Sequence, residues 1–237
     1  MIAKPSTLQL YLLPRGPCPY LDGLTEQKAA TLLDKSDAAL APLLIERGFR
    51  RSQGMFYRQK CPTCRACLAS RLCLKDFKPT GGFARTLKKN ADLSFTVEVP
   101  LATFPLYELF SAYLHARHAE GGMANMSYGA FQQMMEDFPA DTKFLVARKG
   151  DDVMGVMQFD DLPDGASAVY SFFKPEEEKR SLGTWMILKL AEYTAKAEKP
   201  YIYLGFWVKQ SQKMSYKAKF QPLELFVDEK WIEFKEG

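Results

Sequence analysis

Apolar positions in this 237-residue chain follow strand spacing in some stretches and helical spacing in others. The clearest example lies between Ala166 and Phe206. Residues 168–173 form an apolar, aromatic run, which predicts a strand. A charged loop follows, residues 184–196 then carry apolar side chains at helical spacing, and the aromatic run 201–206 predicts a second strand. A strand, a helix and a strand in this order form a crossover unit, so we expect the two strands to lie parallel in one sheet.

The rest of the chain predicts an α+β fold in two parts. In the N-terminal part we expect a strand over 8–13, a helix over 37–47, a hairpin of residues 49–52 and 55–58, a strand over 69–74 and a short basic helix over 83–90. After it we expect a strand over 93–99, a helix over 104–119, a helix capped by Ser127, and antiparallel strands over 143–148 and 153–162. We therefore place a smaller cysteine-containing α+β domain at 1–91 and a larger domain, a mixed sheet with flanking helices, at 92–237.

Composition describes an ordinary globular protein, with 47% hydrophobic and 25% charged residues. No apolar run reaches membrane-spanning length, and no signal peptide opens the chain. Three of the five cysteines fall within seven residues, which indicates reduced thiols or metal ligands rather than a disulfide framework. We expect a cytoplasmic protein with no membrane partner.

Charge is spread unevenly along the chain. Residues 1–95 hold 16 Lys and Arg against 7 Asp and Glu, whereas the remainder holds 16 against 21. Within this acidic remainder, four lysines fall within the eleven residues 209–219, close to Trp207, Tyr216 and Phe220. Cations bind phosphates and aromatic rings stack on bases, so this segment favours contact with a single-stranded nucleic-acid end. The alternative is a solvated helix face.

The cysteines Cys61, Cys64 and Cys67 form two successive Cys-x-x-Cys steps. This spacing lets three sulfurs converge on one metal, and thiolate is the soft ligand of zinc and iron–sulfur sites. Cys18, in a Pro-rich loop, is the candidate for the fourth ligand. The alternative is a cluster of packed thiols without metal.

The loop of the crossover unit places Arg180, Ser181 and Gly183 where a helix begins, and free backbone N–H groups at that point suit an anion or a polarised carbonyl. The arrangement resembles the acetyltransferase (GNAT) fold, whose acyl-donor loop has the pattern Arg/Gln-x-x-Gly-x-Gly/Ala. Trp185 replaces the last small residue of that pattern, which speaks against binding of the coenzyme A pyrophosphate.

A set of short motifs spread along the chain makes the resemblance more specific. They are residues 16–21, 48–53, 57–58, 90–93, 113–118, 168–173, 180–184, 201–207, 213–214, 216–217 and 220, together with the cysteine triplet. In these motifs the chain resembles the bacterial aminoacyl-tRNA–protein transferases, which are relatives of the eukaryotic arginyltransferases. It is most similar to their aspartate/glutamate leucyltransferase branch.

This resemblance implies transfer of leucine from leucyl-tRNA to proteins that begin with Asp or Glu, a degradation signal in the N-end rule pathway. The ester is already activated, so no cofactor is required, although the cysteines would hold zinc or an iron–sulfur cluster. The implied residue roles are hypotheses: a catalytic cleft with Tyr170, Ser171 and Tyr203, the ester or terminal adenosine at Arg180, Ser181 and Gly183, tRNA at Lys213, Tyr216 and Lys217, and the acceptor carboxylate at Arg50, Arg51 or Arg117.

Other functions stay open from the sequence alone. They are arginine transfer from arginyl-tRNA, N-acetylation by a coenzyme A-dependent enzyme of the same fold, and a non-enzymatic, metal-stapled RNA-binding module. The sequence identifies neither a general base nor the walls of the aminoacyl pocket.

Overall fold

The structure is a computed structural model that describes residues 8–118, 123 and 125–235. Its strands are β1 (Tyr11–Leu12), β2 (Gly16–Pro17), β3 (Thr25–Glu26), β4 (Lys28–Leu32), β5 (Arg50–Ser52), β6 (Met55–Gln59), β7 (Leu68–Cys73), β8 (Ser94–Glu98), β9 (Thr142–Lys149), β10 (Asp152–Leu162), β11 (Gly165–Phe173), β12 (Tyr201–Trp207), β13 (Leu223–Val227) and β14 (Lys230–Glu233). Its helices are α1 (Leu40–Glu46), α2 (Gly82–Lys89), α3 (Phe104–His118), α4 (Tyr128–Glu136), α5 (Leu182–Lys196) and α6 (Gln212–Ser215), with 3₁₀ turns η1 (Lys35–Asp37), η2 (Pro175–Arg180) and η3 (Tyr216–Lys219).

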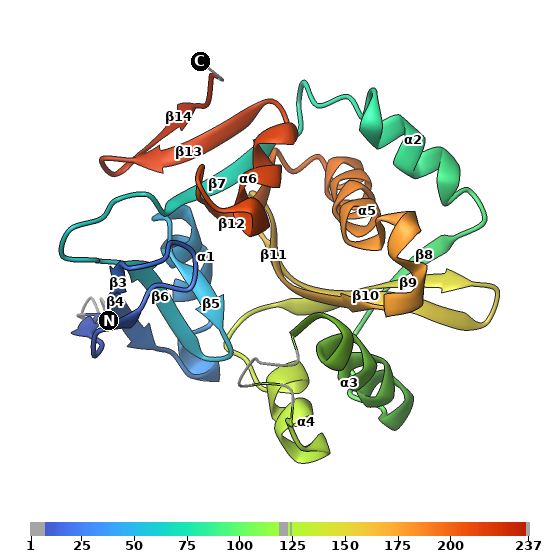
Figure 1. Cartoon of the computed structure of the whole chain (residues 1–237), viewed down its shortest axis with the longest axis horizontal. Coiled ribbons are helices and arrows are strands. Elements are labelled where there is room, and N and C mark those ends of the chain that lie inside the picture. Colours follow the sequence, from blue (N-terminus) through green and yellow to red (C-terminus); the bar gives the residue numbers. More distant parts are fainter. Residues whose placement is uncertain (1–7, 119–122, 124, 236–237) are drawn as a thin grey trace, which may run out of the picture.

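A mixed sheet of eight strands organises the part of the chain that the structure describes, in the order β14-β13-β7-β12-β11-β10-β9-β8. The pair β11–β12 is parallel and the other pairs are antiparallel, which confirms the predicted crossover through α5. Helix α5 covers one face of this sheet, and α3 and α4 cover the other (Figure 1). None of the described helices combines the length and apolarity needed to cross a membrane.

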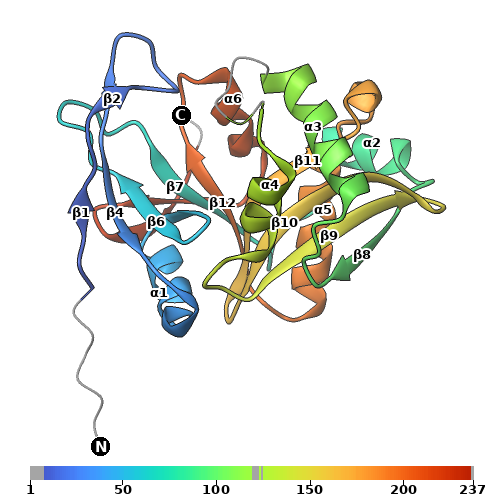
Figure 2. The same ribbon diagram turned by 90° about the horizontal axis from the view of Figure 1, so that it is seen from below.

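The N-terminal segment forms a smaller sheet, β1-β4-β6-β5, that includes the predicted hairpin β5–β6. Strand β7 also belongs to this segment in sequence, but it lies between β13 and β12 in the large sheet. Figure 2 shows β1, β4 and β6 on one side, β8 and β9 on the other, and β7 and β12 between them. Residues on both sides of position 91 therefore share one sheet.

Three apolar clusters hold these layers together. Helix α5 buries apolar side chains around most of its circumference, including Trp185, against the large sheet. Phe110 and Phe131 belong to a second cluster, in which α3 and α4 pack on the opposite face. A third cluster joins the N-terminal sheet to β10 and β12 through residues such as Phe56, Leu162 and Tyr203. Burial of an aromatic or large aliphatic side chain contributes about 1.5–3 kcal/mol, so these contacts fix the layers in place.

A buried ion pair joins the N-terminal hairpin to the large sheet. The Arg51 guanidinium on β5 donates to both carboxylate oxygens of Asp160 on β10, at 2.8 and 2.6 Å, and to Thr142 Oγ1 at 3.3 Å. The two charged side chains are 2% and 0% exposed. The hypothesis that Arg51 binds the acceptor carboxylate is therefore corrected, because the buried carboxylate of Asp160 already occupies the Arg51 guanidinium.

We expect Arg51→Met to lower the free energy of unfolding by about 3–5 kcal/mol, because it leaves the Asp160 carboxylate buried without its cation. Replacing both partners, with Arg51→Met and Asp160→Leu, should recover most of that loss. Chemical denaturation measures both effects. The control is Glu229→Gln, which removes the exposed partner of Arg58 at 2.7 Å and should cost less than about 1 kcal/mol. A parent-like midpoint for Arg51→Met would show that the pair does not hold the hairpin on the sheet.

Candidate functional site

Strands β11 and β12 separate after a short paired stretch. They pair only over Gly165–Ser167 and Tyr201–Tyr203, although β11 continues to Phe173 and β12 to Trp207. A cavity of about 410 Å³ opens beside the two diverging ends. Its lining includes Ala168, Val169, Tyr170 and Ser171 from β11, Leu204, Gly205 and Phe206 from β12, Tyr20, Arg50 and Tyr57 from the N-terminal segment, and Met214, Tyr216 and Lys217 from the segment after β12.

Arg50 lies where the pairing of β11 and β12 ends. Its guanidinium donates to the Ala168 carbonyl at 2.6 Å and to Ser167 Oγ at 3.2 Å, both on β11. On the β12 side it contacts Gly205, which has φ +84°. A Cβ on Gly205 would lie 2.9 Å from Arg50 Nε, so only glycine allows both this backbone conformation and this approach.

Lys217 brings a second basic side chain to the same cavity. It is 5% exposed, and its Nζ donates to the Phe206 carbonyl. Burial, and after it the nearby Arg50 charge, lower the pKa of Lys217 to about 7. Among the described residues, no acidic side chain lines this cavity. The arrangement suits a ligand that brings a negative charge.

A second cavity of about 390 Å³ adjoins the first, and the two share Ser171, Ile187 and Tyr216 in their linings. It is also lined by Ser181, Gly183 and Thr184 at the start of α5. Because the two cavities meet at shared side chains, we treat them as one site, the β11–β12 cleft. Tyr216, at 38% exposure, lies at their junction.

The start of α5 borders this cleft through Ser181, Gly183 and Thr184. Ser181 has a left-handed backbone (φ 56°, ψ 47°), and its side chain makes no capping hydrogen bond. The Trp185 N–H donates to the Ser181 carbonyl at 3.0 Å and is the first helical bond of α5. The N–H groups of residues 182–184 have no partner within the helix, whereas the Ser181 N–H donates to the Glu178 carbonyl at 3.1 Å. They can bind an anion or a carbonyl oxygen that accumulates negative charge.

Arg180 supports this loop and is not among the residues that line the cleft. Its guanidinium makes a two-pronged contact with Asp92, at 2.8 and 3.0 Å, and donates to Glu177 at 2.9 Å. Hydrogen bonding from Arg180 lowers the pKa of Asp92 to about 2. Asn90 completes the link by donating to the Arg180 carbonyl at 2.9 Å. The structure thus gives Arg180 a positioning role, in place of the expected contact with the ester or adenosine.

The remaining predicted site residues separate into cleft and surface positions. Arg117 lines the second cavity and forms an ion pair with Glu178 at 3.0 Å. Lys213 is exposed on α6, whereas Lys217 is buried in the cleft, so the two predicted tRNA contacts face different surroundings. Tyr203 lies in the third apolar cluster instead of the cleft, and its hydroxyl donates to Asp164 at 2.6 Å. That position corrects its expected place in the cleft wall.

Gly205 and Tyr20 are among the cleft residues to which the sequence analysis gave no role. Gly205 interrupts an aromatic strand, and an isolated glycine in a strand indicates a bulge or a close approach of another group. The structure has both, since the β12–β7 register shifts between Tyr203 and Gly205. Tyr20 lies within one of the motifs used above, but nothing in its sequence context indicates the cleft, because it reaches the cavity through tertiary packing.

The cysteines lie next to the cleft. Cys61, Cys64 and Cys67 line a cavity of about 370 Å³ that shares Phe206 with the cleft. The pKa of Cys67 rises to about 12, first through burial and then through the charges of Cys18, Cys61 and Cys64. The four thiols are thus near enough to influence one another electrostatically, and thiolates are the ligands that thiophilic metals prefer. No three metal-ligating side chains in the described residues are arranged to hold a metal, however, so zinc or iron–sulfur binding stays a prediction.

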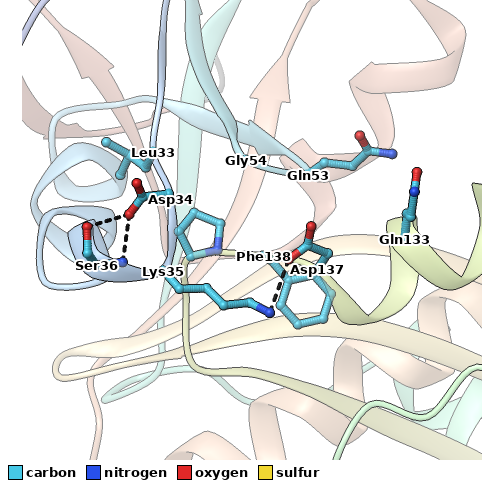
Figure 3. A pocket seen from close by; sticks show the side chains of 10 residues that line it. Leu33, Asp34, Lys35, Ser36, Gln53, Gly54, Gln133, Asp137 and Phe138 are labelled. Atoms are coloured by element: carbon cyan, nitrogen blue, oxygen red, sulfur yellow. Dashed lines mark hydrogen bonds and ion pairs between the residues drawn. The ribbon is translucent and has the colours of Figure 1, made fainter.

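Another cavity, of about 500 Å³, lies between η1, the β5–β6 turn and the end of α4 (Figure 3). Four of its polar side chains are engaged in contacts with other residues of the lining. Asp34 accepts hydrogen bonds from the backbone and side chain of Ser36, and Lys35 contacts Asp137 at 3.1 Å. None of the predicted site residues lines it.

Comparison with known proteins agrees with the motifs. The family profiles described as arginine-tRNA-protein transferase, N terminus and C terminus, match residues 16–85 and 106–227. A protein of Parvibaculum lavamentivorans named aspartate/glutamate leucyltransferase is 45% identical over 94% of this chain and 93% of its own length. A protein of the same name from Methylorubrum extorquens is 42% identical over 95% of this chain and 96% of its own length.

Among solved structures, the chain is similar to L-PGS from Bacillus licheniformis, with a TM-score of 0.47 and 12% identity over 75% of this chain and 51% of that chain. That likeness is too weak to argue from. The sequence relationships are decisive by comparison, because they extend over nearly the whole chain at 45% and 42% identity. The chain belongs to the arginine-tRNA-protein transferase family.

Proposed function

We propose that this protein transfers leucine from leucyl-tRNA to the N-terminal amine of proteins that begin with Asp or Glu, and so marks them for degradation by the N-end rule pathway. The family and the names of its relatives support an aminoacyl-tRNA-dependent transferase. The observation that carries the acceptor specificity is the pairing of Arg50 and Lys217 in a cavity without an acidic lining residue. Such an enzyme meets charged tRNA and new N-termini in the cytoplasm.

The proposed reaction suits an acyltransferase fold of the GNAT type. The observations in its favour are the parallel strands β11 and β12, which separate beside a cavity, and the crossover helix α5, whose first turn borders that cavity. Coenzyme A is disfavoured as the acyl donor. The backbone N–H of Trp185 already binds Ser181, and the Trp185 side chain lies in the core.

In this proposal Arg50 binds the side-chain carboxylate of the acceptor. A guanidinium presents a planar fork of donors that matches a carboxylate. Two N–H groups of Arg50 donate to β11, and its other N–H groups remain available to a ligand. Among the described residues it makes no ion pair with a carboxylate of the chain, unlike Arg51 with Asp160 and Arg117 with Glu178. The acceptor therefore supplies the missing negative charge.

The aminoacyl end of the tRNA would occupy the second cavity. Tyr216 offers an aromatic face to the terminal base, since base–aromatic stacking is worth about 1–3 kcal/mol per base. Lys213 and Lys219, both exposed on the same segment, would contact the phosphates outside. Ser171 and Tyr170 lie between this position and Arg50, where the ester and the amine would meet.

The chemistry then consists mainly of positioning. The ester is activated before it arrives, so the site must hold a neutral amine against the ester carbonyl and stabilise the oxyanion that forms. The free N–H groups at the start of α5 border the cleft and can donate to that oxygen. Arg180 contributes indirectly, because its contact with Asp92 holds the loop that carries those groups.

A substrate panel tests the proposed function. Labelled leucyl-tRNA, arginyl-tRNA and acetyl-CoA are each offered to peptides beginning with Asp, Asn and Lys, and labelled peptide is counted. We expect label only from leucyl-tRNA and only on the Asp peptide. Labelling by arginyl-tRNA would reassign the donor, and labelling by acetyl-CoA would make the protein an N-acetyltransferase. RNA binding without any transfer would support the alternative of a non-enzymatic RNA-binding module.

Arg50→Gln should lower kcat/KM for the Asp peptide by about 100-fold, since removing one partner of a buried charge pair costs about 2–5 kcal/mol. The preference for the Asp peptide over the Asn peptide should disappear, while KM for leucyl-tRNA stays near the parent value. The comparison variant is Arg117→Gln, at an exposed position already paired with Glu178. If Arg117→Gln abolished the preference and Arg50→Gln did not, the carboxylate site would lie in the second cavity.

Replacing both Lys213 and Lys219 with Ala should weaken tRNA binding and flatten its salt dependence. Each lost contact to a single-stranded phosphate lowers the slope of log K against log salt by about 0.7. Filter binding between low and moderate salt measures the slope. Lys196→Ala, at the far end of α5 from the loop, is the control for loss of a lysine elsewhere on the surface. A double variant with the parent slope would remove these lysines from the tRNA contact.

A further inference from the structure

The geometry points to Lys217 as the proton acceptor of the transfer reaction, the group that takes a proton from the α-ammonium of the acceptor protein. This role rests on the proposed function and deepens it by naming the catalytic base. An N-terminal amine is mostly protonated near neutral pH, because its ordinary pKa is about 7.7–8.0. A protonated amine has no lone pair with which to attack the ester, so the site needs a group that removes this proton.

The position of Lys217 fits a base rather than a phosphate contact. At 5% exposure it lies inside the cleft, whereas Lys213 and Lys219 are exposed on the same segment. It shares the first cavity with Arg50, the proposed carboxylate site. The α-amine and the side-chain carboxylate of an N-terminal Asp or Glu belong to one residue. An acceptor held at Arg50 therefore carries its amine into the cavity that Lys217 lines.

The surroundings of Lys217 favour its neutral form. Its Nζ donates to the Phe206 carbonyl and contacts Met214 Sδ at 3.7 Å. The charged and titratable groups around it are Arg50 from β5, Tyr57 from β6, Tyr170 from β11, Tyr216 from η3, and Tyr20 and Cys67 from the N-terminal loops. None of these side chains is a carboxylate. A neutral lysine can still donate to Phe206 and keeps a lone pair for an incoming ammonium.

The pKa of Lys217, about 7, agrees with this geometry. Burial is the main cause, and the Arg50 charge acts in the same direction. An exposed lysine titrates near 10.4 and would stay protonated. When the acceptor carboxylate docks at Arg50, its negative charge raises the pKa of Lys217. Binding of the correct acceptor thus strengthens the base at the moment when the α-ammonium arrives.

The step balances as follows. The α-ammonium gives one proton to the Lys217 amine and becomes a neutral amine. Its lone pair forms a bond to the ester carbonyl carbon, and the carbonyl electrons move to the oxygen. When the intermediate collapses, the bond to the ribose oxygen breaks, that oxygen takes a proton from the attacking nitrogen, and an amide is formed. Lys217 returns its proton to solvent, so the reaction releases one proton and needs no oxidant, reductant or metal.

Two substitutions separate a base from a simple cation. Lys217→Arg keeps the positive charge but does not deprotonate, and Lys217→Met removes the nitrogen while filling a similar buried volume. We expect both to lower kcat with the Asp peptide by about 100-fold or more at pH 7.5, because general-base catalysis contributes about 10²–10⁴-fold. The rise of the parent kcat with pH, whose midpoint lies above 7 because the bound acceptor raises the pKa of Lys217, should be absent from both. Thermal unfolding and the affinity for leucyl-tRNA serve as controls for the fold and for donor binding.

A labelling experiment on the parent protein gives a readout that does not depend on turnover. Limiting acetic anhydride acetylates an amine only in its neutral form, and mass spectrometry gives the rate of modification of Lys217 as a function of pH. We expect that rate to rise with a midpoint near 7, and to shift upward when a non-reactive peptide beginning with Asp is bound. Lys213 on the same segment is the internal comparison.

Each outcome decides the assignment. A Lys217→Arg variant within about threefold of the parent would overturn it and leave Lys217 as a cation only. A labelling midpoint near that of an exposed lysine would also overturn it, even if the variants failed to fold. A parent that labels near pH 7 but transfers no leucine would overturn the proposed function itself.

Discussion

The candidate site depends on one guanidinium inserted where two parallel strands separate. Arg50 donates to Ser167 and Ala168 on β11 and lies against Gly205 on β12, so it binds the β11 carbonyl just beyond the last paired residue. A strand that leaves its partner exposes backbone groups that need new hydrogen bonds. Arg50 supplies one at that point, which lets the strands diverge and keeps a cation at the floor of the resulting cleft.

The position of Arg50 between β11 and β12 explains why the site depends on the N-terminal half of the chain. Arg50 and Arg51 are neighbours on β5 and point to opposite faces, so one enters the cleft and the other is locked onto Asp160 of β10. Strand β7 continues the large sheet beyond β12, and Phe206 of β12 borders both the cleft and the cysteine cavity. A structural change at the cysteines can therefore affect the cleft through the side chain of Phe206.

Most of the secondary structure could be predicted from the sequence because local periodicity encodes it. The crossover β11–α5–β12, the hairpin β5–β6 and helix α4 with its Ser127 cap all follow from apolar spacing and capping residues. The place of β7 did not follow, because its partners β12 and β13 are more than a hundred residues away in the chain. The hairpin β13–β14 was missed as well. Likewise, motifs led to the expectation of Tyr170 and Ser171 in the cleft and of Tyr216 at the tRNA, and all three line the cavity, whereas Tyr203 packs in the third apolar cluster.

The basic residues show what sequence motifs leave undetermined. Arg50, Arg51, Arg117, Arg180 and Lys217 all lie in the motifs that identify the family, and all were assigned to substrates. In the described structure, three of them have a carboxylate of the chain beside them: Asp160, Glu178 and Asp92. The positive charge of each of these three arginines is already compensated by that carboxylate. They can affect the reaction only by holding a helix, strand or loop in position. Arg50 is held by a backbone carbonyl and a hydroxyl instead, which orient its cation without neutralising it, and Lys217 is held by a backbone carbonyl. Because an uncompensated buried charge is costly, a protein keeps it where a ligand supplies the counter-charge. In the proposed reaction, selectivity for an acidic acceptor follows from the same electrostatics that lower the pKa of Lys217. The carboxylate that neutralises Arg50 would also raise the pKa of Lys217 and so strengthen it as a proton acceptor.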